Sequence, residues 1–268
     1  MAFEPRGFFS LPDYVQSERM VHVGEAIAQC MHMAPIPSVL SVQSEVREAF
    51  GWSEEDDVES AVLLQQSLAN HSLWAPAMRE LTLTRLRNEL VNAERVVLLG
   101  AAVEPSELQR FDGTQAVFVA ADGAVGVLET FNRLACVVSD FDGAEHLDRA
   151  AEAGQIIVAH AHGDNTNRWN GILQRWQEHS TPPSLVLSHQ VTKELTGVYN
   201  FGGFTDGDRA LCFVLSMGVI PENIELIGFS TRKVGAWSAT TTPPIKMQKL
   251  EWMRRIVTEL GFGDSIRS

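Results

Sequence analysis

Hydrophobic and polar positions follow two different patterns along the 268-residue chain. From Val15 to Leu90, apolar residues recur at helical spacing, and no run of β-branched residues interrupts them. Ser53 is followed by Glu54, Glu55 and Asp56, which is typical of a helix N-cap and its acidic first turn. We therefore expect a helical N-terminal region over residues 1–92, interrupted once at Pro35 and Pro37.

After residue 92, short apolar runs alternate with helical stretches, and each run ends near Gly, Asp or His. Nearly continuous apolarity is typical of parallel strands that are covered on both faces. The pattern predicts a doubly wound, mainly parallel α/β domain over residues 93–268, with ligands bound at the carboxyl ends of the strands. The expected strands are Val96–Leu99, Ala116–Ala120, Ala135–Val138, Gln155–Ala159, Ser184–Leu187 and Ile224–Ile227.

Charge and cysteine content narrow the classes of partner. The chain has 34 acidic and 21 basic residues, a net charge of −13, and no basic run, which disfavours nonspecific nucleic-acid binding. Cys30, Cys136 and Cys212 are widely spaced and flanked by apolar residues, as expected of reduced thiols in a cytoplasmic protein. No segment approaches the ~20 apolar residues that span a bilayer. We expect neither nucleic-acid nor membrane partners, whereas a homodimer formed through the helical region stays open.

The third predicted strand ends in the motif SDFDG, residues 139–143. Two carboxylates spaced two residues apart at a strand end can reach one cation from the same side, as hard oxygen-seeking ions require. Capping would explain one aspartate, but placing both there without a cation costs electrostatic repulsion. The motif therefore predicts a metal site at Asp140 and Asp142.

The fourth predicted strand leads into HAHGDN, residues 160–165. Strand alternation would put His160 and His162 on one side, where they could bind zinc with Asp164 in a metallohydrolase. Magnesium held by Asp164 and the two SDFDG aspartates fits better, because those ligands are oxygens and no further His or Cys lies nearby in sequence. Either histidine could instead hydrogen-bond the backbone.

Three other places carry weaker signals for phosphate or nucleotide binding. Gly100 opens a turn before a helix, which suits either a phosphate loop or an ordinary strand-to-helix turn. Asp122, followed by Gly123, could accept a hydrogen bond from a ribose or amino group, or form an Asx turn. Lys246 and Lys249 could reach phosphates if the last helix packs over the crevice, and otherwise they lie on a solvated surface.

The segment NFGGFTDGDR, residues 200–209, combines paired glycines with two phenylalanines that could stack on a flat heterocycle. Thr205 would cap a helix that starts near Gly207. The segment is either a substrate lid or a glycine-rich turn whose phenylalanines belong to the core. Its candidate substrate-binding residues are Asn200, Phe201, Gly203, Phe204, Thr205 and Asp206.

Taken together and in this order, ADGA, SDFDG, HAHGDN, NFGGFTDGDRA and the C-terminal KxxKL resemble the archaeal 6-hydroxymethyl-7,8-dihydropterin pyrophosphokinase family, often called MptE-like. The resemblance covers roughly Arg95 to the C-terminus. That family is related to thiamin pyrophosphokinase, whose ADGG and GDFDS motifs are similar to residues 121–124 and 139–143.

The resemblance implies transfer of a diphosphate from ATP to the hydroxymethyl group of a reduced pterin, with release of AMP and a requirement for Mg²⁺, in tetrahydropterin or folate-type biosynthesis. It implies a catalytic set of Asp140, Asp142, Asp164, Asp208 and Arg209, with the first three as metal ligands. It also implies that Asp122 and Gly123 line the nucleotide or pterin pocket, although the loop at Gly100 departs from the family's form. The residues that we predict to bind the nucleotide are Gly100, Asp122, Gly123, His162, Gly163, Asn165, Lys246 and Lys249.

Three other functions stay open at this point. MptE-like domains also occur in proteins linked to flagellin glycosylation, so a sugar-nucleotide or glycosylation-linked transferase would use the same metal and diphosphate chemistry. A metal-dependent phosphohydrolase would use His160 and His162, and a noncatalytic regulator would bind nucleotide without turnover. The sequence lacks GxSxG, and phosphoryl transfer of this kind needs no covalent nucleophile.

Overall fold

The computed structural model describes residues 37–238 and 243–267, which belong to one compact unit over residues 33–268. Cys136 and Cys212 are buried free thiols within it. Cys30, Pro35 and the predicted helical spacing before residue 37 lie outside the described residues. No helix in the described part is long and apolar enough to cross a bilayer.

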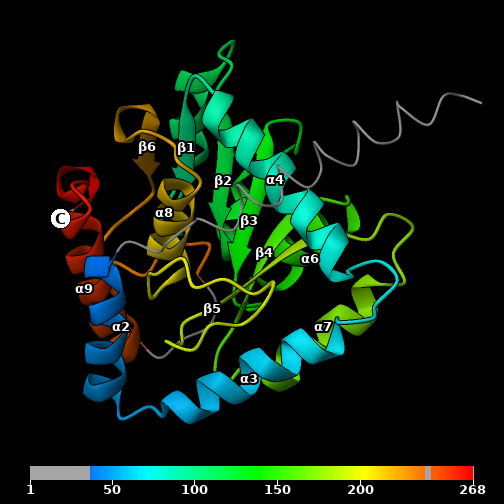
Figure 1. The fold of residues 1–268 in the computed structure, drawn as a ribbon. Coiled ribbons are helices and arrows are strands. Elements are labelled where there is room, and N and C mark those ends of the chain that lie inside the picture. The colour runs from blue at the N-terminus through cyan, green and yellow to red at the C-terminus, as the bar shows by residue number, and fades with distance from the viewer. Residues whose placement is uncertain (1–36, 239–242, 268) are drawn as a thin grey trace, which may run out of the picture. The chain divides into compact units, whose positions relative to one another are not determined.

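A six-stranded, all-parallel sheet with the order β5-β4-β3-β2-β1-β6 forms the centre of this unit (Figure 1). The sheet and the helices around it confirm the predicted α/β fold. Strands β4 and β5 each extend two residues further than the sequence predicts, so their last residues carry side chains into the carboxyl edge. The strands are β1 Val96–Leu99, β2 Val117–Ala121, β3 Leu134–Ser139, β4 Ile156–Ala161, β5 Ser184–His189 and β6 Ile224–Ile227.

The strand order reverses at β1. From β1 to β5 each strand pairs with the one before it, and from β5 the chain returns across the sheet to place β6 beside β1. Because both directions use right-handed crossovers, α8 lies on the opposite face from α6 and α7. The connecting elements are α5 Pro105–Leu108, η1 Gln109–Phe111, η2 Asp122–Val127, α6 Ala144–Glu152, α7 Thr166–Trp176, α8 Asp206–Ser216 and η3 Pro221–Asn223.

Between residue 37 and the sheet the chain is helical, as predicted, and forms α2 Pro37–Phe50, α3 Glu54–Ser67 and α4 Pro76–Asn92. Ser53 caps α3, because its Oγ accepts hydrogen bonds from the backbone N–H groups of Glu55 and Asp56. Helix α3 contacts β4, β5 and α7, and α4 packs on β3 and β5. At the other end of the chain, α9 Pro243–Glu259 contacts α2 and α8 and is followed by η4 Gly263–Ser265. The division into domains at residue 92 stays a prediction.

His189, the last residue of β5, couples the stability of this fold to pH. Its ring is buried, and its Nδ1 accepts a hydrogen bond of 3.1 Å from the N–H of Val191. Burial lowers the pKa of His189 to about 4. The unfolded chain, with a pKa near 6.5, therefore binds more protons than the folded chain between these values, and folding loses stability as the pH falls through this window.

We expect this histidine to remove about 3 kcal/mol from the free energy of unfolding between pH 6.5 and pH 4. The His189→Asn variant keeps an acceptor for Val191 but cannot be protonated, so its unfolding free energy should fall less steeply over the same window. Urea titrations at several pH values measure both slopes. Equal slopes for the two proteins would assign the acid sensitivity to other groups.

Candidate active site

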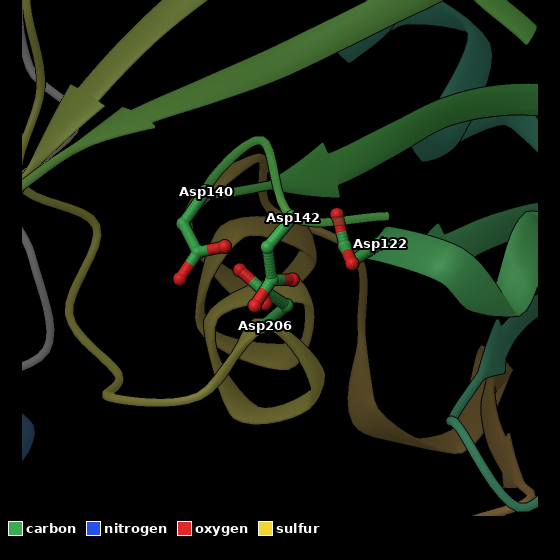
Figure 2. Close-up of side chains that lie close together, drawn as sticks. All are labelled: Asp122, Asp140, Asp142 and Asp206. Atoms are coloured by element: carbon green, nitrogen blue, oxygen red, sulfur yellow. The ribbon is translucent and has the colours of Figure 1, made fainter. Parts of the chain in front are cut away.

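Four aspartates converge at the carboxyl edge of the sheet (Figure 2). Asp122 follows β2, Asp140 and Asp142 follow β3, and Asp206 begins α8. One carboxylate oxygen from each lies within 4.8 Å of the others. Asp142 and Asp206 lie between the other two in the close-up (Figure 2). We call these residues the carboxylate cluster.

The backbone between the two SDFDG aspartates explains why both face the same space. Phe141 has a φ of 73°, in the left-handed region that a bulky residue rarely adopts, and such a conformation costs ~1–3 kcal/mol. Its side chain is fully buried against Trp176, with ring centroids 5.7 Å apart, and its N–H donates to Ser139 Oγ at 2.8 Å. The buried ring and this hydrogen bond hold the turn that aims Asp140 and Asp142 into the cluster.

The pKa values of the cluster depart from those of ordinary aspartates. Burial raises the pKa of Asp122, Asp142 and Asp206, and the negative charges of neighbouring carboxylates raise it further, to about 7 for Asp206. Asp140 differs, because the hydrogen bond and charge of His162 outweigh its burial and hold its pKa well below the usual range. In the absence of a cation, the cluster therefore concentrates carboxylates that resist ionising together.

These features fit a metal ion. Asp140 Oδ1 is buried and has no hydrogen-bond partner among the described residues, which is costly unless a ligand satisfies it. The donor set is entirely carboxylate oxygen, the chemistry preferred by hard divalent cations such as Mg²⁺ and Ca²⁺. The carboxylate cluster could therefore bind a metal ion and relieve its own repulsion.

Asp164, the third metal ligand suggested by sequence, stands apart from the carboxylate cluster. Its side chain is 89% exposed, and its Oδ1 lies 2.7 Å from Nδ1 of His162. On the other side, Nε2 of the same imidazole lies 3.1 Å from Asp140 Oδ2. The role of Asp164 as a metal ligand stays a prediction, whereas Asp122 and Asp206 lie where the sequence reasoning had not placed metal ligands.

The two histidines of HAHGDN have different environments. Burial lowers the pKa of His160 well below its usual value, and its ring nitrogens face Ser188 Oγ at 3.0 Å and Gln190 Oε1 at 3.4 Å. For His162, burial opposes protonation, but the hydrogen bonds to Asp140 and Asp164 outweigh it and raise the pKa to about 9. His160 is thus a neutral core residue and His162 a cation, and neither joins the metal-binding group found among the described residues.

A cavity of about 370 Å³ surrounds the carboxylate cluster. Among the residues predicted from sequence, it is lined by Gly100, Asp122, Asp140, Asp142, His162, Gly163, Asp164, Phe204, Thr205, Asp206, Arg209, Lys246 and Lys249. Helix α9 places Lys246 and Lys249 in the lining of this cavity, which their predicted contact with phosphates requires. Sequence reasoning missed several other lining residues, among them Trp52, Asp57, Gln190, Phe229 and Trp237.

Six of the predicted site residues, all within the described part, support the cavity from outside its lining: Gly123, Asn165, Asn200, Phe201, Gly203 and Asp208. The Asp208 carboxylate accepts from the N–H groups of Phe204 and Thr205 and from Thr205 Oγ1, so it closes a capping box at the start of α8. Its catalytic role stays a prediction. Phe201 packs edge-on against Phe213 in the core. Helix α8 begins at Asp206, one residue before the predicted start.

Asn165 and Gly123 support the backbone of the loops around the site. Asn165 Nδ2 donates to the carbonyl oxygens of His160 and Asp140, and its Oδ1 accepts from the N–H of His162, which ties the ends of β3 and β4 together. A Cβ on Gly123 would lie 2.4 Å from the carbonyl oxygen of Trp237, so this position admits only glycine. These residues hold the loops that carry the site.

Comparison with known proteins adds a family to this geometry, although no family model matches the chain. The chain is 32% identical over 218 residues to a 6-hydroxymethyl-7,8-dihydropterin pyrophosphokinase of Pyrococcus furiosus, covering 77% of this chain and 86% of that protein. Proteins of the same name from Methanocaldococcus jannaschii and Methanothermobacter thermautotrophicus are 28% and 26% identical, covering 81% and 83% of this chain and 92% and 93% of theirs. The chain belongs to the family of archaeal 6-hydroxymethyl-7,8-dihydropterin pyrophosphokinases.

Proposed function

We propose that this protein transfers a diphosphate from ATP to the hydroxymethyl group of 6-hydroxymethyl-7,8-dihydropterin and that the reaction requires Mg²⁺. The observation that carries the proposal is the carboxylate cluster, because four converging aspartates next to cationic side chains suit a metal-bound polyphosphate. Similarity to pyrophosphokinases that act on 6-hydroxymethyl-7,8-dihydropterin supports the choice of substrate.

In this reaction the hydroxymethyl oxygen attacks the β-phosphorus of ATP, a new O–P bond forms, and the hydroxyl proton is released to solvent. The bond from that phosphorus to the oxygen bridging the α-phosphate breaks, and AMP leaves with that oxygen. A divalent cation held by the carboxylate cluster would neutralise charge on the phosphate oxygens. Asp140, Asp142, Asp122 and Asp206 would hold it, and the first two are positioned by the strained turn at Phe141.

Cationic side chains beside the cluster are assigned to the phosphates. Arg209 NH1 lies 3.2 Å from Asp206 Oδ1 and 3.9 Å from Asp140 Oδ2, so its guanidinium borders the cluster. Lys246 lines the cavity from α9, and its charge partly opposes the effect of burial on the pKa of Asp142. Preorganised positive groups of this kind stabilise charge that develops during phosphoryl transfer.

An aromatic wall at one side of the cavity is assigned to the pterin ring. Trp52, in the turn between α2 and α3, is 41% exposed and stacks on Phe50 at a centroid distance of 4.7 Å. The Trp52 indole also lies 5.9 Å from the ring of Phe204, and Lys249 Nζ lies 5.3 Å from the Trp52 ring. Lys246 and Lys249 are three residues apart on α9, so both line the cavity within about one helical turn of each other.

We expect Trp52→Leu to raise the KM for the reduced pterin about 5- to 150-fold, since stacking on an aromatic side chain contributes ~1–3 kcal/mol per base. The KM for ATP should change much less, and Trp52→Phe should recover part of the loss. Steady-state kinetics with each substrate varied in turn gives both constants.

Trp252→Leu is a matched control, because Trp252 is also an indole beside a cation, Arg255 at 5.3 Å, but lies on α9 outside the cavity lining. It should leave both constants nearly unchanged. A rise in the KM for ATP alone in Trp52→Leu would assign the wall to adenine instead.

The proposed function is tested by incubating the protein with ATP, Mg²⁺ and 6-hydroxymethyl-7,8-dihydropterin and resolving the products by mass. We expect AMP and the pterin diphosphate in equal amounts. Inorganic phosphate without pterin diphosphate would identify a hydrolase, and binding without turnover would identify a regulator. Either result would overturn the proposal.

A further inference from the structure

A buried polar chain runs from the N-terminal helices to Arg209. Arg209 NH2 donates to Gln190 Oε1 at 3.0 Å, and Gln190 Nε2 donates to Asp57 Oδ2 at 2.9 Å. The other oxygen of Asp57 accepts from the N–H of Gly163 at 2.8 Å. Asp57, Gln190 and Arg209 are each at least 93% buried, with exposed fractions of 5%, 7% and 6%. These hydrogen bonds therefore join α3, the loops after β4 and β5, and the start of α8.

We infer that Asp57 and Gln190 are positioning residues that orient the Arg209 guanidinium for the phosphates of the substrate. The inference rests on the proposed function, which assigns Arg209 to those phosphates. It also gives the N-terminal helical region a role in the reaction, because Asp57 lies in the first turn of α3.

The direction of the Gln190 side-chain amide connects Asp57 to Arg209. An amide has one accepting oxygen and one donating nitrogen, and here the oxygen faces the guanidinium of Arg209 and the nitrogen faces Asp57. The guanidinium of Arg209 can only donate and the carboxylate of Asp57 can only accept, so both ends favour this direction of the amide. An ionised carboxylate offers two acceptors, which serve Gln190 and Gly163 at the same time.

Neighbouring groups reinforce this arrangement. Arg47 NH1 donates to the backbone oxygen of Gln190 at 3.0 Å and lies 3.9 Å from Asp57 Oδ2, so a second buried arginine supports the carboxylate. Arg209 is fixed from its other side by Asp206 at 3.2 Å. Its buried Nε has no hydrogen-bond partner among the described residues, so Gln190 and Asp206 hold the guanidinium by hydrogen bonds, with Asp140 at a longer distance of 3.9 Å.

Asp57→Asn disturbs the hydrogen bonds from Asp57 through Gln190 to Arg209 but keeps the shape of the side chain. If the new oxygen faces Gly163, the new NH₂ faces Gln190, whose amide must then turn and present its own NH₂ to Arg209. If the oxygen faces Gln190 instead, the N–H of Gly163 loses its acceptor. We expect the population with a turned amide to misplace Arg209, and kcat/KM to fall about tenfold or more.

Glu54→Gln is the matched control. Glu54 also lies in the first turn of α3 and binds the segment after β5, because its Oε1 accepts from the N–H and the hydroxyl of Thr192. Its Oε1 also lies 3.7 Å from Arg47 NH2, so it shares the arginine beside Asp57 but makes no hydrogen bond to Gln190. It lies outside the cavity lining. We expect less than a twofold change in kcat/KM for this variant, even where its melting temperature falls as much as that of Asp57→Asn.

A double-mutant cycle between Asp57→Asn and Arg209→Lys tests the inference, with Arg209→Ala as a second partner in case the lysine variant does not fold. If Asp57 acts through Arg209, Asp57→Asn should lower kcat/KM in the wild-type background and have no further effect once Arg209 is replaced, while its effect on melting temperature persists. Additive losses in kcat/KM would overturn the inference and leave Asp57 a structural residue.

Wild-type turnover of the reduced pterin decides the proposed function separately, before any variant is made. If the wild type does not turn over, the same cycle is measured on the dissociation constant of MgATP by calorimetry. Coupling in that constant would uphold the inference while the pterin reaction fails. Additive effects, or no ATP binding by the wild type, would overturn the inference.

Discussion

The Asp142→Asn variant is expected to fold normally and to lose turnover by about 100- to 1000-fold, which corresponds to ~3–4 kcal/mol of transition-state stabilisation. Asparagine keeps the shape of the side chain and one oxygen, but it removes a negative charge from the carboxylate cluster. The cation then binds more weakly and neutralises less of the charge on the phosphate oxygens. The loss should appear in kcat and in the concentration of Mg²⁺ needed for half-maximal activity.

Stability should move in the other direction. Burial and the charge of Asp140 already raise the pKa of Asp142, which shows that a second negative charge is unfavourable there when no cation is bound. The asparagine relieves this repulsion, so the melting temperature of the metal-free variant should equal or exceed that of the wild type. Activity and stability measured on the same preparation separate a functional loss from unfolding.

Two further substitutions sharpen this result. Asp112→Asn is a control, because Asp112 is exposed in the turn before Gly113 and lies outside the cavity lining. It should leave both turnover and the Mg²⁺ requirement unchanged. Asp164→Asn tests whether Asp164 is a metal ligand, as the sequence suggests, or stands outside the carboxylate cluster. If Asp164 binds the metal, this variant should lose as much activity as Asp142→Asn. Near-normal AMP release by Asp142→Asn would mean that Asp142 is only a turn residue.

The sequence predicted the sheet and the place of the site because both depend on local signals. Continuous apolar runs such as Val96–Leu99 require burial on both faces, and in a parallel sheet the residues that follow the strands must meet at one edge. Asp140 and Asp142 could be paired as ligands because two residues of spacing bring them together without any knowledge of distant contacts.

The remaining parts of the site depend on tertiary contacts that local patterns do not encode. Asp164 follows β4 closely, yet His162 lies between its carboxylate and Asp140. Asp206 joins the carboxylate cluster only because the crossover from β5 returns across the sheet. Asp57 looks like an ordinary acidic residue of a helix start, and only its partners Gln190 and Gly163 reveal its position at the cavity.

Removal of divalent cations is expected to abolish turnover and to lower the melting temperature of the wild type. The cation binds the folded chain through groups that the unfolded chain does not hold together. At 100 times its dissociation constant it therefore contributes ~2.7 kcal/mol, or about 5–10 °C for a chain of this size. Dialysis against a chelator, followed by thermal unfolding with and without added Mg²⁺, measures this shift.

The dependence of this effect on pH follows from the carboxylates. Burial and the charge of Asp140 raise the pKa of Asp206 to about 7 in the metal-free protein, so cation binding must displace a proton below that pH. The shift in melting temperature produced by Mg²⁺ should therefore shrink as the pH falls from 8 to 6. In Asp206→Asn, which has no such proton to lose, the smaller remaining shift should depend less on pH.

The ion that restores activity after dialysis distinguishes a carboxylate metal site from a histidine site. An all-carboxylate site with room for water and phosphate oxygens favours Mg²⁺ or Mn²⁺ over zinc, which prefers histidine and cysteine ligands. Added Mg²⁺ should therefore restore AMP release after dialysis, and zinc alone should not. Recovery with zinc alone, especially if it were lost in His162→Gln, would place the metal between the histidines and favour a hydrolase over the proposed transferase.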